Sequence, residues 1–146
     1  STVVVIPPAP NRHGHGTILL VEDFEPLREL TARILRDAGY RVLAARDGQE
    51  ALQLVHGAEE QLRLLVSDVV MPKMNGPSLA AHLRQLRPEL RVLFLSGYAE
   101  PLQRRETLNL PGSRYLQKPY KPEELLCEVE RLLLESEAEI PVLTGV

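Results

Sequence analysis

Short apolar runs alternate with segments of helical spacing along residues 17–134. The run 91–96 is apolar almost throughout, which is typical of a strand that is covered on both faces. Strands that alternate with helices favour a parallel sheet, so the chain is expected to be an α/β protein. The prediction is a doubly wound, five-stranded parallel sheet with helices on both faces. The expected strands are 17–21, 41–45, 62–67, 91–96 and 113–117.

The segments between these runs carry the helix signals. A first helix is expected before Gly39, which ends it, and a second over 48–57. A third helix runs from about Leu79 and ends before Pro88. Segment 98–109 has poor helical spacing and is the least regular. A last helix begins at Lys121-Pro122, and its expected inner stripe is Leu125, Val129, Leu132 and Leu133.

Length and composition bound the possible functions. The 146 residues suit one domain, expected over 17–134, between a linker (1–16) and a C-terminal tail (135–146). A formal net charge of −3 gives no general attraction to nucleic acid or to an anionic membrane. No apolar run approaches the roughly 20 residues that span a bilayer. The lone Cys127 excludes an intrachain disulfide and fits a reducing compartment. We therefore expect a cytoplasmic monomer or weak dimer that binds neither nucleic acid nor membrane.

Polar residues follow four of the expected strands at the point where each strand ends. They are Glu22 and Asp23, Asp68, Ser96, and Lys118. In an open parallel sheet, ligands bind outside the carboxyl ends of the strands, where the strand order reverses. In a flavodoxin-like order 2-1-3-4-5, that point lies between the first and third strands, so Asp23 and Asp68 should face each other.

Carboxylates this close together cannot all stay ionised without a counter-charge. Mg²⁺ supplies one, since it takes one or two carboxylates together with waters and a phosphate oxygen. Lys118 adds a fixed positive charge and Ser96 a hydroxyl donor. The sequence therefore predicts a Mg²⁺-dependent site for a phosphoryl group, with Asp68 as the nucleophile.

Four motifs resemble the receiver domain of two-component response regulators. The motifs are ILLVED (18–23), VSDVVMPKMNG (66–76), VLFLSGYAE (92–100) and YLQKPY (115–120), in the order and spacing of that family. The resemblance implies that Asp68 accepts a phosphoryl group from a phosphohistidine of a histidine kinase or a histidine phosphotransfer domain. The domain would then be a phosphoacceptor in a phosphorelay rather than an enzyme.

The resemblance also implies a role for each residue of the site. Asp23, with Glu22 acting through water, would hold Mg²⁺ together with Asp68 and the backbone carbonyl of Val70. Ser96 and Lys118 would contact the phosphoryl oxygens. Tyr115 would be the aromatic residue whose rotamer reports the phosphorylation state.

The N-terminal stretch STVVVIPPAP weakly resembles the last strand of a histidine-kinase ATP-binding domain. The phrases SGYAE and LQKPY are similar to receivers fused behind hybrid sensor kinases. We therefore expect this chain to be the C-terminal receiver of a hybrid histidine kinase.

Three alternatives stay open. An Asp-nucleophile, Mg²⁺-dependent phosphohydrolase typically needs a second acid–base Asp two residues after the nucleophile, where this chain has Val70. A flavin-binding flavodoxin-like protein needs a phosphate-binding loop after the first strand, where this chain has EDFEPL. A degenerate receiver that acts only as an interaction module would lack the complete residue set.

Overall fold

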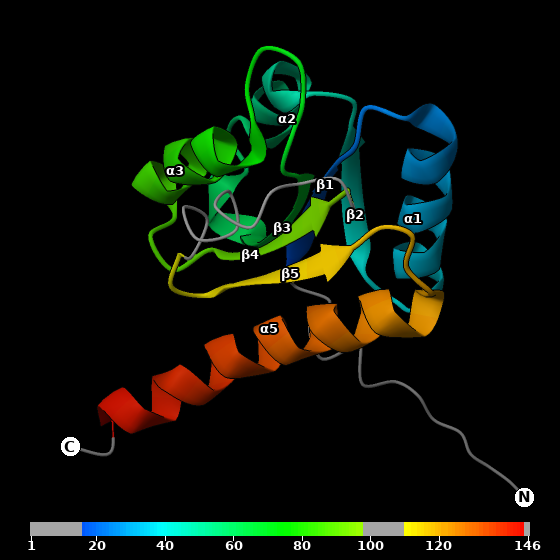
Figure 1. Ribbon diagram of the computed structural model, residues 1–146. Coiled ribbons are helices and arrows are strands. Elements are labelled where there is room, and N and C mark those ends of the chain that lie inside the picture. The colour runs from blue at the N-terminus through cyan, green and yellow to red at the C-terminus, as the bar shows by residue number, and fades with distance from the viewer. Residues whose placement is uncertain (1–15, 98–109, 145–146) are drawn as a thin grey trace, which may run out of the picture.

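A parallel sheet of five strands forms the centre of the molecule (Figure 1). The computed structural model describes residues 16–97 and 110–144. The strand order is β2-β1-β3-β4-β5 and every strand pair is parallel, so the predicted fold class and strand order are confirmed. The strands are β1 (Thr17–Val21), β2 (Arg41–Ala45), β3 (Leu62–Asp68), β4 (Arg91–Ser96) and β5 (Ser113–Gln117).

Local signals start and stop the helices between these strands. Asp47 caps the start of α2 by accepting a hydrogen bond from the Glu50 amide at 2.8 Å. Asn75 caps α3 by accepting one from the Ser78 amide at the same distance. Gly39 follows α1 with φ 103°, a left-handed conformation that glycine adopts without strain. The helices are α1 (Glu25–Asp37), α2 (Gly48–Val55), α3 (Gly76–Leu86), α5 (Pro122–Thr144) and the short 3₁₀ turn η2 (Glu59–Gln61).

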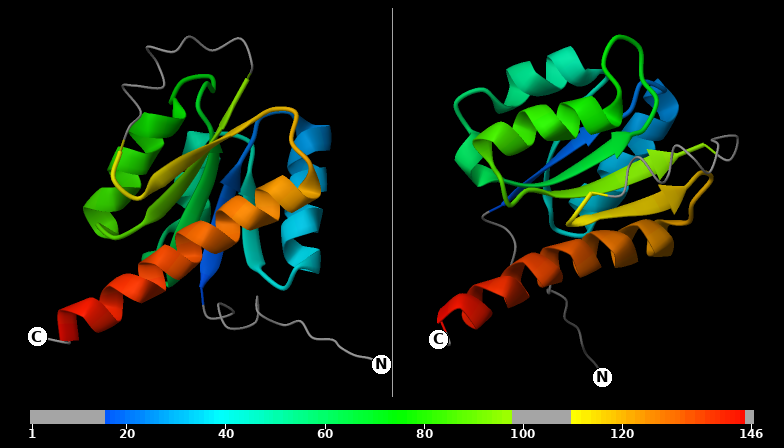
Figure 2. Two further views of the ribbon diagram at one scale, coloured as in Figure 1. Left: turned by 60° about the horizontal axis from the view of Figure 1, so that its bottom comes forward. Right: turned by 60° about the vertical axis from the view of Figure 1, so that its left-hand side comes forward.

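Helices cover the sheet on both faces, α1 and α5 on one and α2 and α3 on the other (Figure 2). Alternate residues of the central strands point to opposite faces, so Leu19 and Leu65 join one core cluster while Leu20 and Leu64 join the other. The strands therefore bury both faces, as their unbroken apolar character predicts. The four residues expected on the inner stripe of the last helix are all buried: Leu125, Val129, Leu132 and Leu133.

Some element bounds differ from the predicted ones. The helix predicted over 48–57 ends at Val55, because the chain turns at His56 and Gly57, where φ is 82°. The last helix runs to Thr144, across residues expected to form a tail, because the Glu and Ala residues of 135–139 are strong helix formers. The domain boundary after 134 stays a prediction. The linker 1–15, the irregular segment 98–109 and residues 145–146 lie outside the described residues.

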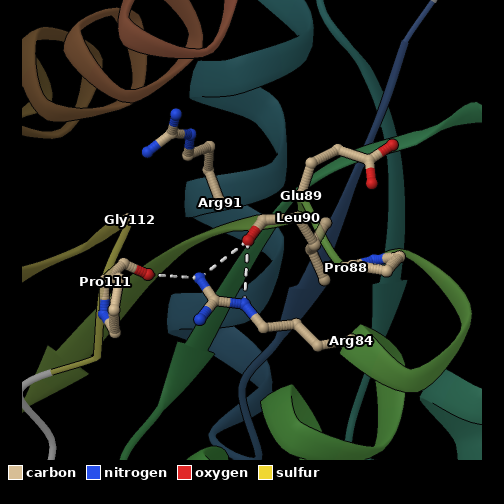
Figure 3. Close-up of a pocket in the computed structure, with 7 residues that line it drawn as sticks. All are labelled: Arg84, Pro88, Glu89, Leu90, Arg91, Pro111 and Gly112. Atoms are coloured by element: carbon tan, nitrogen blue, oxygen red, sulfur yellow. Dashed lines mark hydrogen bonds between the residues drawn. The ribbon is translucent and has the colours of Figure 1, made fainter. Parts of the chain in front are cut away.

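Neither the long α5 nor any other described helix is apolar over the length needed to cross a membrane. A pocket of about 380 Å³ lies at the amino-terminal ends of β4 and β5 (Figure 3). Arg84 closes it by donating hydrogen bonds to the carbonyls of Leu90 and Pro111. The candidate residues Glu22, Asp23, Asp68, Ser96 and Lys118 lie at or just after the carboxyl ends of the strands, so this pocket is separate from them.

Candidate functional site

The strand register brings the predicted polar residues to one edge of the sheet. Val21 of β1 pairs with Ser67 of β3, so Glu22 and Asp68, the next residues of the two strands, lie side by side. On the other side, Ser96 of β4 pairs with Gln117 of β5, and Lys118 follows directly. The arrangement follows from parallel pairing, since parallel strands place their carboxyl ends together.

Lys118 joins the two buried carboxylates. Its Nζ lies 2.6 Å from Oδ1 of Asp68 and 2.9 Å from Oε1 of Glu22. The carboxylates are almost sealed from solvent, with Glu22 1% and Asp68 3% exposed, whereas Asp23 is exposed. Burying two anions is costly unless a cation pairs with them, and Lys118 meets that requirement for one charge.

Hydrogen bonds to its carboxylate and to its main chain fix Glu22 in place. Its Oε2 accepts a hydrogen bond from the Phe24 amide at 3.0 Å. The guanidinium of Arg28 donates to the Glu22 carbonyl at 2.9 Å, and the Glu22 amide donates to the Ala45 carbonyl at 3.1 Å. Glu22 therefore has a direct contact with Lys118 and a fixed orientation, neither of which the sequence indicated.

The electrostatics of Asp68 reflect its crowded position. Burial raises the pKa of Asp68 to about 8, and the neighbouring Glu22 carboxyl adds to the rise while Lys118 opposes it. Burial alone would lower the pKa of Lys118, but the Asp68 and Glu22 carboxylates outweigh it and leave that pKa raised. Lys118 stays charged, and the carboxyl pair keeps a proton near neutral pH unless a second cation arrives.

The carboxyl groups fit a divalent cation. One oxygen each from Glu22, Asp23 and Asp68 lies within 4.8 Å of the others. Among the described residues, neither Oε1 of Glu22 nor Oδ1 of Asp68 accepts a hydrogen bond, although Lys118 contacts both. An all-oxygen donor set of two buried carboxylates and one exposed carboxylate suits a hard ion such as Mg²⁺.

The loop after Asp68 is shaped by close backbone contacts. The Gly76 amide donates to the Val69 carbonyl at 2.8 Å. A side chain at Gly76 would place its Cβ 2.3 Å from the Asp68 carbonyl oxygen, so only glycine fits there. Within the loop, Lys73 adopts a left-handed φ of 72°. Val70 is 56% exposed beside the carboxylates, and its side chain brings no acid–base group to the site.

Ser96 and Tyr115 occupy the β4–β5 side of the site. Ser96 is buried, and its carbonyl accepts a hydrogen bond from the Lys118 amide at 2.8 Å. Tyr115 is half-buried on β5, with its ring centroid 5.9 Å from that of Phe94. Both residues lie on the strands that the sequence predicts, Ser96 on β4 next to the Asp68 strand and Tyr115 on β5 beyond it, and their roles stay predictions.

A comparison with protein families decides which kind of α/β protein this is. The response regulator receiver domain model matches residues 18–130, which include all the residues of the site. The chain belongs to this receiver family. As a receiver it is a domain of two-component phosphorelay signalling.

Individual receivers are similar over most of the chain. The sensor kinase CckA of Brucella abortus is 39% identical over 123 residues, which are 82% of this chain but 13% of CckA. The response regulator receiver protein CpdR of the same species is 32% identical over 117 residues, 80% of this chain and 96% of CpdR. A crystal structure of the receiver domain from hybrid histidine kinase CckA is 37% identical, with TM-score 0.69, covering 81% of this chain and 99% of that one.

One contact of this receiver was not predicted from its sequence. Tyr120, at the end of the KPY motif, shares a hydrogen bond of 2.8 Å with Thr31 of α1. Thr31 is fully buried, in place of the apolar residue that such a position normally holds. The only sequence signal is this polar residue on the inner face of a helix, and spacing alone cannot name its partner 89 positions away.

Proposed function

We propose that this receiver takes a phosphoryl group on Asp68 from a phosphohistidine of a histidine kinase or a histidine phosphotransfer domain. A carboxylate oxygen of Asp68 forms the new bond to phosphorus, and the P–N bond breaks with its electron pair going to the imidazole. The observation that carries the proposal is the convergence of Glu22, Asp23 and Asp68 with the Lys118 ammonium 2.6 Å from Asp68.

Mg²⁺ is the proposed cofactor. Asp23, Asp68 and the backbone carbonyl of Val70 would hold it, with Glu22 acting through water. The ion would neutralise charge on the transferring group and orient it for in-line attack. The raised pKa of Asp68 supports this assignment, because the nucleophile must be ionised and Lys118 alone does not bring its pKa to the usual range.

Lys118 and Ser96 are proposed to bind the phosphoryl oxygens. The Lys118 ammonium already contacts the acceptor oxygen of Asp68, so it is placed to share its charge with the incoming group. The Ser96 hydroxyl would donate a hydrogen bond to a phosphoryl oxygen. The end of β4 would shift with it and leave space into which Tyr115 turns, a two-state change biased by local charge.

The phosphohydrolase alternative has little support. The residue two positions after Asp68 is Val70, whose exposed apolar side chain carries no acid–base group. We therefore propose that this segment is a phosphoacceptor and not itself an enzyme.

We further propose that the parent protein is a hybrid sensor histidine kinase with this receiver at its C-terminal end, and that the receiver works in the cytoplasm. The sequence similarity to sensor kinase CckA supports the first part.

Intact-mass analysis after incubation with acetyl phosphate and Mg²⁺ tests the acceptor. The wild-type chain is expected to gain about 80 Da, the mass of one phosphoryl group. Asp68→Asn should gain nothing, whereas Asp37→Asn, an exposed carboxylate at the far end of α1, should behave as wild type. No gain in the wild type, or a gain kept by Asp68→Asn, would contradict the proposal.

A further inference from the structure

We infer that Tyr120 is a positioning residue for phosphoryl transfer, because its hydrogen bond to Thr31 fastens the loop that carries Lys118 against α1. The inference rests on the proposed function and adds a residue to it. Tyr120 touches neither the acceptor oxygen nor the donor, so it acts through Lys118.

The contact is well defined. Oγ1 of Thr31 and the hydroxyl of Tyr120 lie 2.8 Å apart, and the Tyr120 ring packs against the core cluster shared by α1 and α5. Thr31 is 0% exposed. A buried hydroxyl is costly to leave without a hydrogen-bond partner, and the Thr31 and Tyr120 hydroxyls satisfy each other.

The bond connects α1, which follows Glu22, with the loop that carries Lys118. Thr31 belongs to α1, which begins three residues after Glu22, and Tyr120 follows Lys118 by two residues. The segment between β5 and α5 runs alongside α1 in Figure 1 and in the left view of Figure 2. The Thr31–Tyr120 bond therefore joins the same two stretches of chain as the Glu22–Lys118 ion pair, at a second and neutral point.

The position of the Lys118 ammonium depends on this second contact between the loop and α1. A lysine side chain loses conformational entropy when it is held in one geometry, so its backbone must be fixed for the ammonium to stay beside Asp68. The Lys118 amide is held on one side by the Ser96 carbonyl. On the other side, Tyr120 connects the loop to α1 through its hydrogen bond with Thr31.

Variants of Thr31 separate positioning from mere packing. Thr31→Ser keeps the hydroxyl and loses a methyl group, whereas Thr31→Val keeps the shape and loses the hydroxyl. The measured quantity is the phosphorylation rate of Asp68 at saturating acetyl phosphate and Mg²⁺, followed by intact mass. Misplacing a catalytic group by 1 Å can cost about a hundredfold in rate. We expect Thr31→Val and Tyr120→Phe each to be slower by about tenfold, and Thr31→Ser to stay within about twofold of wild type.

Two further readouts sharpen the test. The double variant Thr31→Val, Tyr120→Phe should be no slower than either single variant, because both remove one shared bond. The Mg²⁺ concentration for half-maximal rate should not change, since the proposed ligands lie at the carboxyl ends of β1 and β3 and directly after them, away from the Thr31–Tyr120 bond. Circular dichroism identifies any variant that does not fold. If Thr31→Val does not fold, Tyr120→Phe tests the same hydrogen bond by removing its other hydroxyl.

The outcomes are distinct. A packing role predicts the reverse order, with Thr31→Val as fast as wild type and Thr31→Ser the slower of the two, and would overturn the inference. Additive losses in the double variant would overturn it as well. If the variants match a wild type that is readily phosphorylated, only this inference fails; if the wild type gains no mass, the proposed function fails and takes the inference with it.

Discussion

Asp68 is a carboxyl group held almost out of water between another carboxylate and an ammonium. Its pKa rises to about 8 in the folded chain, mainly through burial, whereas in the unfolded chain it has the ordinary value of about 4. Between these two values the folded state holds a proton that the unfolded state has lost. Without metal, the contribution of Asp68 to stability is therefore fully present below about pH 4 and is lost as the pH rises to about 8.

We predict that Asp68→Asn stabilises the metal-free protein and that the gain grows from pH 5 to pH 8. The neutral amide cannot ionise, so it avoids a cost of up to about 1.4 kcal/mol per pH unit in that window. Urea unfolding in the presence of a chelator at several pH values measures the difference. Asp37→Asn is the matched control and should show no such trend, and a gain that does not change with pH would contradict the explanation.

At the scale of elements, the conformation of the loop from Asp68 to the start of α3 depends on Gly76. We predict that Gly76→Ala destabilises the fold by about 1–3 kcal/mol, the usual cost of forcing a methyl group into a packed position. Its Cβ would lie 2.3 Å from the Asp68 carbonyl oxygen, so the acceptor strand must move and phosphorylation should slow as well. Chemical denaturation and the acetyl phosphate assay measure the two effects.

Gly97 provides the control for this substitution. A Cβ added there would meet no atom within 4 Å among the described residues. Gly97→Ala should therefore leave the free energy of unfolding within about 0.5 kcal/mol of wild type. Equal losses for the two alanine variants would show that the close approach at Gly76 is not the cause.

The packing of α5 on the sheet gives a second prediction at this scale. Leu132 is fully buried, and Leu132→Ala is expected to lower the free energy of unfolding by about 2–5 kcal/mol through the cavity it leaves. Leu134, two residues further and 42% exposed, is the matched control, and Leu134→Ala should cost under about 1 kcal/mol. Thermal or urea unfolding of the two variants would reveal the contrast, and equal costs would argue against the docked helix.

The elements themselves could largely be predicted from the sequence. Short apolar runs predict strands such as Thr17–Val21 because burial on two faces favours apolar side chains at almost every position. The spacing does not settle which residues of a helix face inward. In α1 the exposed Leu30 fits the apolar pattern while the buried Thr31 does not. Thr31 is buried because Tyr120 satisfies its hydroxyl, and that partner is known only once the chain is folded.

At the scale of the whole molecule, the site couples metal binding to folding. We predict that Mg²⁺ raises the free energy of unfolding of the wild type, by about 1.4 kcal/mol at ten times its dissociation constant. The stabilisation should be larger at pH 8 than at pH 6, because at the lower pH the ion must displace a proton from the Asp68 pair. Thermal unfolding with and without Mg²⁺ measures it.

The variant Asp23→Asn provides the comparison for this effect. Asp23 is exposed, so its loss should leave the metal-free stability nearly unchanged while it removes one proposed ligand. Stabilisation by Mg²⁺ that persists in full in Asp23→Asn would count against the assigned ligand set. Ca²⁺, a hard cation of larger radius, serves as the second ion for comparison.

The position of the site could be predicted from the sequence because parallel topology requires it. Polar residues at the ends of several parallel strands must meet at one edge of the sheet, so the sequence predicts that Glu22, Asp68 and Lys118 lie together. The details of the site could not be predicted in the same way. The direct Glu22–Lys118 contact and the hydrogen bond from the Phe24 amide depend on side-chain directions that no spacing rule specifies.

The hydrogen bond between the Lys118 amide and the Ser96 carbonyl uses main-chain atoms alone. Trimming either side chain to alanine leaves that link intact, so β4 and β5 stay paired where they meet the acceptor. The Ser96 hydroxyl can thus be removed while the strand pairing stays in place, whereas removal of the Lys118 ammonium also leaves the buried Glu22 and Asp68 carboxylates without their cation.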